Sequence, residues 1–283
     1  MKNLLLELDG NGLSYYVGGD PEKPTVICFH GLAGSSLYSF TQLSNQLKEQ
    51  FHVILIDQPG HGKSSAFEKE EDYTFSSLAK WYDKVFDYLQ LNEFYLLGHS
   101  WGADVALHYA KQYPAKVKGI ILLDGGFTFP VFQEEMTFQK AYNGWSTYMD
   151  NHAKFTSWRD IVDEFKGYTK AWNTIHEQSL SSIFIKKGKY ELISSKFTIL
   201  SIIKAFFNEP FTSTYLYIKS PLLLIHATEP KELDEARNKG IAEIKQEINN
   251  ALIVSIENTG HMLQWDKPKE VGDKIILWVN KTR

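Results

Sequence analysis

The pentapeptide at residues 98–102, Gly-His-Ser-Trp-Gly, has the form G-x-S-x-G with Ser100 at its centre. An apolar run suited to a short strand precedes it at residues 94–97, and a helix-forming run follows it. A serine at such a strand-to-helix corner is held in a strained conformation with its hydroxyl exposed, and the flanking glycines leave room for neighbouring backbone. The helix aims its first N–H groups at the same spot. The pattern predicts a nucleophile beside a site for an oxyanion.

A serine hydroxyl at its ordinary pKa is a weak nucleophile and needs a neighbouring base. His261 is the leading candidate because it follows a predicted strand and Gly260. His226 ends another predicted strand and is the one rival that we name.

The composition bounds the kind of protein that carries these residues. The 283 residues are 43% hydrophobic, enough for one domain with an insertion or for two domains. The net charge of −4 gives no basic footprint for nucleic acid. The single cysteine, Cys28, suits a reducing compartment. With no signal-peptide pattern and no apolar stretch of membrane-spanning length, we expect a soluble cytoplasmic protein without a membrane or nucleic-acid partner.

Strands and helices alternate along the chain. A hairpin is predicted over residues 4–17, followed by buried strands at 25–29, 51–56, 94–97, 117–123, 221–225 and 251–256. Helices are predicted at 40–49, 74–89, 101–112, 231–249 and 268–280. This alternation predicts an α/β fold whose mostly parallel central sheet has helices on both faces. Sites in such folds lie beyond the carboxyl ends of the strands, so the motifs at 30–36, 57–64, 98–102 and 124–126 are expected to converge.

The pattern changes after residue 127. Residues 128–216 lack buried-strand runs, look mainly helical and are richer in aromatic residues than the rest of the chain. We predict an inserted helical lid over 128–216 and a core made of 1–127 and 217–283. Several lid rings are expected to line a substrate pocket as well as to pack the lid.

Four motifs, each after a predicted strand, together resemble the α/β-hydrolase fold family, in its serine hydrolase or esterase form with a helical lid. They are His30-Gly31, the D-x-P-G-H-G-x-S stretch at 57–64, the G-x-S-x-G pentapeptide, and Gly260-His261. The resemblance covers nearly the whole chain. It implies a lid inserted after the sixth strand and the chain order serine, acid, histidine, which agrees with His261 as the base.

The resemblance also implies roles around the serine. The backbone N–H groups of Leu32 and Trp101 are expected to form the oxyanion hole. His30 is expected to support the loop that carries Leu32, with Gly31 and His99 beside the substrate pocket. Asp57, in this family, shapes a turn near the site and is not expected to be catalytic.

The acid that orients His261 has two candidates. Most family members carry Asp a few residues beyond the strand that matches 221–225, but here the residues are His-Ala-Thr-Glu-Pro at 226–230, with Pro230 at the expected position. Glu229 is one residue short of it. The second family location follows the strand before the lid, and there the chain has Asp124. Either acid would hold the imidazole tautomer and stabilise the imidazolium.

We therefore predict a serine hydrolase that cleaves an ester or related acyl bond of a small, largely apolar substrate through an acyl-enzyme intermediate. No cofactor or metal is expected, because the sequence has no Cys/His cluster and no H-E-x-x-H pattern. The physiological substrate and the oligomeric state stay open.

Other activities of the fold stay open as alternatives: lactonase, thioesterase, carbon–carbon bond hydrolase, aminopeptidase and cofactor-free haloperoxidase. Serine at position 100 argues against dehalogenase and epoxide hydrolase chemistry, for which the family needs Asp. A catalytically silent ligand receptor is a further alternative, which the irregular acid site favours.

Overall fold

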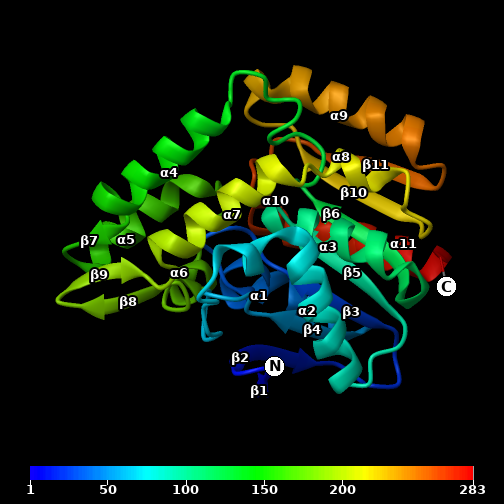
Figure 1. Ribbon diagram of the computed structural model, residues 1–283, viewed down its shortest axis with the longest axis horizontal. Coiled ribbons are helices and arrows are strands. Elements are labelled where there is room, and N and C mark those ends of the chain that lie inside the picture. Colours follow the sequence, from blue (N-terminus) through cyan, green and yellow to red (C-terminus); the bar gives the residue numbers. More distant parts are fainter. Residues whose placement is uncertain (283) are drawn as a thin grey trace.

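Eight strands form the central sheet, in the order β1-β2-β4-β3-β5-β6-β10-β11 (Figure 1). The computed structural model describes residues 1–282. The strands are β1 (Lys2–Leu8), β2 (Asn11–Gly18), β3 (Thr25–Phe29), β4 (His52–Ile56), β5 (Phe94–His99), β6 (Val117–Leu123), β10 (Leu222–Ala227) and β11 (Ala251–Ile256). The β1–β2 and β2–β4 pairs are antiparallel, and every pair from β4 to β11 is parallel. The predicted fold class is confirmed.

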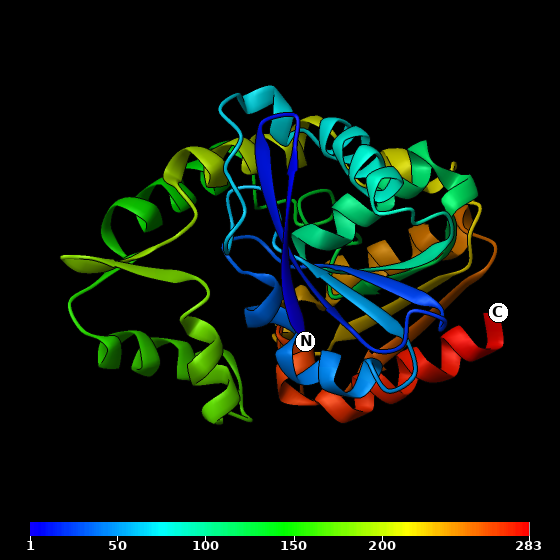
Figure 2. The same ribbon diagram turned by 90° about the horizontal axis from the view of Figure 1, so that it is seen from below.

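Helices cover both faces of this sheet because successive strand residues point to opposite sides. On one face Leu96 and Leu122 pack with α2 (Phe75–Tyr88), α3 (Trp101–Gln112) and Ile244 of α9 (Asp234–Glu247). On the other, Leu97 and Leu123 pack with α1 (Ser36–Leu47) and α11 (Pro268–Thr282). Figure 2 shows α1 and α11 below the sheet and α2 and α3 above it.

Most element bounds follow the apolar runs of the sequence. The bounds of α3, β6 and β11 agree with the predicted ranges. Helix α1 begins four residues earlier than predicted, because the Ser35 hydroxyl accepts the N–H of Tyr38 and caps it. No helix in residues 1–282 combines the length and apolar character needed to cross a membrane.

Most of the segment between β6 and β10 lies to one side of the sheet in both views (Figures 1 and 2), and its last residues, around 211–215, return to the core. It contains α4 (Phe138–Asn151), β7 (Lys154–Phe155), α5 (Trp158–Phe165), α6 (Thr174–Leu180), β8 (Phe184–Lys187), β9 (Lys189–Leu192), α7 (Lys196–Asn208) and α8 (Thr212–Tyr215). The small antiparallel sheet β7-β9-β8 was not predicted, because its strands are short and mostly exposed. Side chains of this segment form an apolar cluster that reaches Tyr38 and Trp265 of the core.

The corner between β5 and α3 is closely packed. Ser100 has φ 53° and ψ −122°, a left-handed backbone conformation that is rare outside glycine. A Cβ on Gly98 would lie 2.2 Å from the carbonyl oxygen of Gly102, and one on Gly102 would lie 2.1 Å from that of Phe29. Only glycine fits at both positions, which explains the spacing of G-x-S-x-G.

We predict that Gly102→Ala lowers the free energy of unfolding by about 1–3 kcal/mol, because backbone must move to admit the methyl group. Gly144→Ala is the matched control: Gly144 lies inside α4 and its added Cβ meets nothing within 4 Å. That change should stabilise the protein by about 0.5–1 kcal/mol. Urea unfolding of both variants measures the difference, and equal stability of Gly102→Ala and the wild type would contradict the steric argument.

Candidate active site

The loops that follow the parallel strands meet at one edge of the sheet and line a cavity of about 890 Å³. Its core-side lining includes residues 31–34 after β3, 99–101 at the corner, 124–126 after β6, and 261–262 after β11. Three of the four motifs expected to converge here line the cavity, which has Gly31, Leu32 and His99 beside Ser100. The motif at 57–64 does not line it, and instead His61 of that motif bonds the loop at Ala33. His30 is fully buried behind it.

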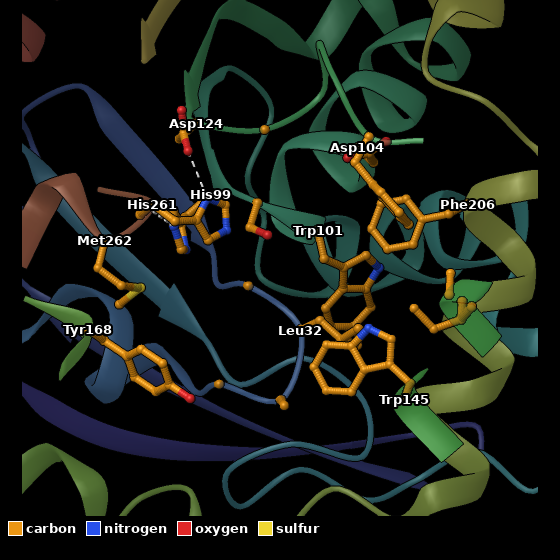
Figure 3. A pocket seen from close by; sticks show the side chains of 18 of the residues that line it. Leu32, His99, Trp101, Asp104, Asp124, Trp145, Tyr168, Phe206, His261 and Met262 are labelled. Carbon is orange, nitrogen blue, oxygen red and sulfur yellow. Dashed lines mark hydrogen bonds and ion pairs between the residues drawn. The ribbon is translucent and has the colours of Figure 1, made fainter. Parts of the chain in front are cut away.

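His261 and Asp124 are joined by a hydrogen bond across this cavity edge (Figure 3). His261 Nδ1 lies 2.7 Å from Asp124 Oδ2, and Asp124 Oδ1 accepts the N–H of Ala227 at 3.0 Å. Burial by itself would raise the pKa of Asp124, but the hydrogen bond from His261 and the Ala227 N–H outweigh it and hold that pKa below its usual value. An ionised Asp124 places the imidazole proton on Nδ1, which leaves Nε2 able to accept one.

Glu229, the other acid left open by the sequence, is held differently. Its N–H donates to the Thr259 carbonyl, and its own carbonyl accepts from Arg237. Within residues 1–282 its carboxylate makes no hydrogen bond with His261. The structure thus brings Asp124, and not Glu229, to the imidazole.

Ser100 lies at the corner between β5 and α3, in the lining of the same cavity. It lines the cavity, and its N–H donates to the Leu123 carbonyl at 3.1 Å, which ties the corner to the end of β6, next to Asp124. The Ser100 hydroxyl has no hydrogen-bond partner within residues 1–282. Such bonds are often loose without substrate, and the His261 side chain is 53% exposed.

Two backbone donors face the same space. Leu32 and Trp101 both line the cavity, and within the described chain neither N–H donates to a protein acceptor. The loop of Leu32 lies directly against the serine, because a Cβ on Gly31 would be 3.2 Å from Ser100 Cβ. The N–H of Trp101 sits at the first position of α3, where helices leave their donors unpaired.

Comparison with known proteins identifies the family. The model of the alpha/beta hydrolase fold family matches residues 24–268. The chain belongs to the alpha/beta hydrolase fold family. It is a hydrolase of that superfamily.

Two curated relatives and one solved structure that span most of this hydrolase are all distant from it in sequence. An uncharacterized hydrolase of Bacillus subtilis, YugF, is 22% identical over 95% of this chain and 94% of its own. Epoxide hydrolase 1 of Caenorhabditis elegans is 23% identical over 95% of this chain and 68% of its own. The solved thioesterase domain from the curacin biosynthetic pathway is 22% identical, with a TM-score of 0.79 over 98% of this chain and 99% of its own.

In this hydrolase two buried histidines fix the loop that carries Leu32. His30 Nε2 accepts the N–H of Gln58 at 2.9 Å, and His61 Nε2 accepts that of Ala33 at 3.2 Å. Each ring therefore carries its proton on Nδ1 and donates it to a carbonyl, that of Gly31 or Pro59. Burial lowers the pKa of each histidine to about 3, so both rings stay neutral and keep these hydrogen bonds to the loop.

His99 supports the loop of His261 from the other side. Its Nε2 lies 2.9 Å from the backbone carbonyl of His261, to which it donates, and the two rings are 4.9 Å apart. Burial, and then the nearby His261, lower the pKa of His99 to about 3. The rival base His226 instead points its Nδ1 at the Ala227 carbonyl and does not line the cavity described above.

Asp57 has the structural role that the sequence suggested. One carboxylate oxygen accepts the N–H and hydroxyl of Ser36, and the other accepts the N–H of Lys63. These bonds hold the start of α1 and the turn at 57–64. Both carboxylate oxygens of Asp57 therefore accept hydrogen bonds from within the fold.

Other lining residues were not named from the sequence. The segment between β6 and β10 contributes a set of aromatic rings, signalled only by its general aromatic content: Phe129, Trp145, Tyr148, Phe165, Tyr168 and Phe206. The core contributes Asp104, on α3, and Met262. Asp266 was also missed. Its carboxylate accepts the N–H of Gly260 and, from the inserted segment, the Thr169 hydroxyl and the Lys170 N–H.

The buried histidines predict a dependence of stability on pH. An unfolded histidine has a pKa near 6.5, and that of folded His61 is about 3. Between these values the unfolded chain binds the additional proton, so the free energy of unfolding falls as the pH falls through this window. We predict that His61→Gln reduces that slope by up to about 1.4 kcal/mol per pH unit.

Urea unfolding between pH 4 and 6.5 measures the slope. The exposed His152 provides the control, because His152→Gln should leave the slope unchanged. Equal slopes for His61→Gln and the wild type would show that His61 is not held neutral in the fold.

Proposed function

We propose that the protein is a serine hydrolase that cleaves an ester or related acyl bond of a small, largely apolar substrate through an acyl-enzyme intermediate. The observation that carries this proposal is the hydrogen bond between His261 and Asp124, in the cavity that also holds Ser100. It supplies an oriented base beside a nucleophile on a strained corner, the arrangement that serine hydrolysis needs.

The chemistry follows from this geometry. Ser100 Oγ attacks the substrate carbonyl carbon while His261 Nε2 takes its proton. The resulting oxyanion is stabilised by the N–H groups of Leu32 and Trp101. The tetrahedral intermediate collapses when protonated His261 gives its proton to the leaving alcohol, and Asp124 stabilises the imidazolium throughout. Water then enters with His261 as base, releases the acid, and restores Ser100.

The cavity supports an apolar acyl or aryl group in the substrate. Its volume of about 890 Å³ lies near the upper end of ordinary small-molecule sites, and aromatic rings of the inserted segment form much of its lining. We propose that residues 128–216 act as a lid, because they supply these rings over the serine. Closing such a lid removes water and strengthens the electrostatic interactions within the site.

Two of the alternatives, epoxide hydrolase chemistry and a silent receptor, fit less well. Epoxide hydrolase 1 is a relative by sequence, but that chemistry calls for Asp where this chain has Ser100. The alternative of a silent receptor depended on an irregular acid site. With Asp124 hydrogen-bonded to His261, that reason for it is gone.

We predict that Ser100→Ala lowers the turnover of p-nitrophenyl esters by more than about 10³-fold and abolishes labelling by a fluorophosphonate, because the attacking oxygen is removed. Ser181→Ala, at an exposed position on the inserted segment, should keep both. Circular dichroism of the variants checks folding. Ester turnover by Ser100→Ala at the wild-type rate would remove Ser100 from the mechanism.

The two candidate acids separate in a second experiment. Asp124→Asn should lower kcat by about 10⁴-fold, the size of the same change in the serine-protease triad, because the amide no longer stabilises the Nδ1–H tautomer. Glu229→Gln should leave kcat close to the wild-type value. Steady-state ester kinetics measure both, and the reverse ranking of the two variants would assign the acid to Glu229.

A further inference from the structure

Asp104 is a buried acid that the reaction above does not use. It lies on α3, one helical turn after Ser100, is 2% exposed, and lines the cavity. Figure 3 places it with Trp101 and Phe206 on one side of the pocket, whereas Asp124 and His261 lie on the other. A substrate whose carbonyl is at Ser100 can therefore extend an arm toward Asp104 without crossing the imidazole.

The Asp104 carboxyl is only partly satisfied by the fold, through the backbone N–H groups of Asp104 and Gly126. Within residues 1–282, its Oδ1 is buried and has no hydrogen-bond partner. Burial, and then the charge of the nearby Asp104, raise the pKa of the Tyr215 hydroxyl. That hydroxyl donates its hydrogen bond to the Gly126 carbonyl, at 2.6 Å, and not to Asp104. Among the described lining residues, Lys140 is the one lysine and there is no arginine, and Lys140 pairs with Glu135 on the surface.

Asp57 shows what a purely structural buried acid looks like in this chain. It is equally buried, at 2% exposure, yet three donors from Ser36 and Lys63 satisfy both of its oxygens. An unsatisfied buried polar atom costs about 1–3 kcal/mol, so a side chain that only filled space at position 104 would be better apolar. The position is explained if the missing partner arrives with the substrate.

Two opposing effects act on the ionisation of the Asp104 carboxyl. The carboxyl sits near the N-terminal end of α3, and the N–H groups of Asp104 and Gly126 act on it in the direction of ionisation. Burial outweighs them and raises the pKa of Asp104 well above its usual value while no cation is present. A bound cation would reverse that balance.

We propose that Asp104 is a specificity-determining residue that binds a protonated amino group on the substrate, at the end of the pocket away from His261. The proposal deepens the proposed hydrolase function by naming a substrate class: amino-substituted acyl compounds. Four residues of helix rise by about 6 Å, which sets the scale of the separation between the reacting carbonyl and the amino group. As the pair forms, the proton of the Asp104 carboxyl passes to water, or to the amine if the amine arrives neutral.

The test compares two esters of nearly equal shape, p-nitrophenyl ε-aminohexanoate and p-nitrophenyl heptanoate. The measured quantity is the ratio of their kcat/KM values within one protein, which cancels any difference in folded fraction. We expect the wild type to favour the amino ester. Asp104→Asn keeps the shape but loses the charge, and it should lower the ratio by about tenfold or more, the size of one charge-assisted interaction of roughly 1.5–3 kcal/mol.

Two further variants complete the design. Asp104→Leu should lower the ratio at least as far as Asp104→Asn, because an apolar side chain suits the methyl end of the heptanoate and not an ammonium group. Asp163→Asn, which removes an exposed acid of α5, should leave the ratio at the wild-type value. An unchanged ratio in Asp104→Asn would overturn the proposal. So would wild-type turnover of p-nitrophenyl ε-hydroxyhexanoate equal to that of the amino ester, since a neutral donor would then suffice.

A binding measurement separates this proposal from the hydrolase function. If neither ester is turned over, the proposed function fails, and thermal unfolding with hexylammonium or with hexanol still tests Asp104. We expect hexylammonium to raise the Tm of the wild type more than hexanol does, and to lose that advantage in Asp104→Asn. The same rise in Tm in Asp104→Asn and the wild type would overturn the assignment whatever the activity.

Discussion

The left-handed backbone of Ser100 is the constraint on which the rest of the site depends. A residue at φ 53° persists only when its surroundings leave no alternative. Here close backbone contacts surround it: Gly102 lies against the end of β3, and a Cβ on Gly125 would be 2.4 Å from the Ser100 carbonyl oxygen. The same contacts that hold Ser100 also place the loop of Leu32 and the loop of Asp124 beside it. One steric arrangement therefore positions Ser100 and both of these loops.

Four histidines in and around the site divide into two groups by the exposure of their side chains. His30, His61 and His99 are buried, neutral and committed to backbone hydrogen bonds, each with a pKa lowered to about 3. His261 alone of these four has a largely exposed side chain and is paired with a carboxylate. Burial fixes the supporting rings in one tautomer, whereas exposure and an ionised partner leave His261 free to exchange a proton. The environment of each ring, and not its residue type, therefore distinguishes the three buried histidines from His261, the proposed base.

Local patterns carried most of the prediction. The bounds of α3 and β6 and the corner at Ser100 follow from glycine spacing and apolar runs, which act over a few residues. The choice between Asp124 and Glu229 depended on a contact across 137 residues, set by the sheet order β6-β10-β11, which no local pattern contains. The strands of the inserted segment were missed because they bury too little to leave an apolar run. Asp104 was missed because an acid in the first turn of a helix is ordinary on electrostatic grounds, and only its burial is unusual.

Asp266 connects the inserted segment to the loop of the base. One of its oxygens accepts from Thr169 and Lys170, and the other accepts the N–H of Gly260, the residue before His261. Residues 169–170 and Gly260 are therefore linked through the two oxygens of one carboxylate. His261 is also held through its carbonyl by His99, which belongs to the rigid corner. The loop of His261 is therefore hydrogen-bonded on one side to the corner between β5 and α3 and on the other side, through Asp266, to the inserted segment.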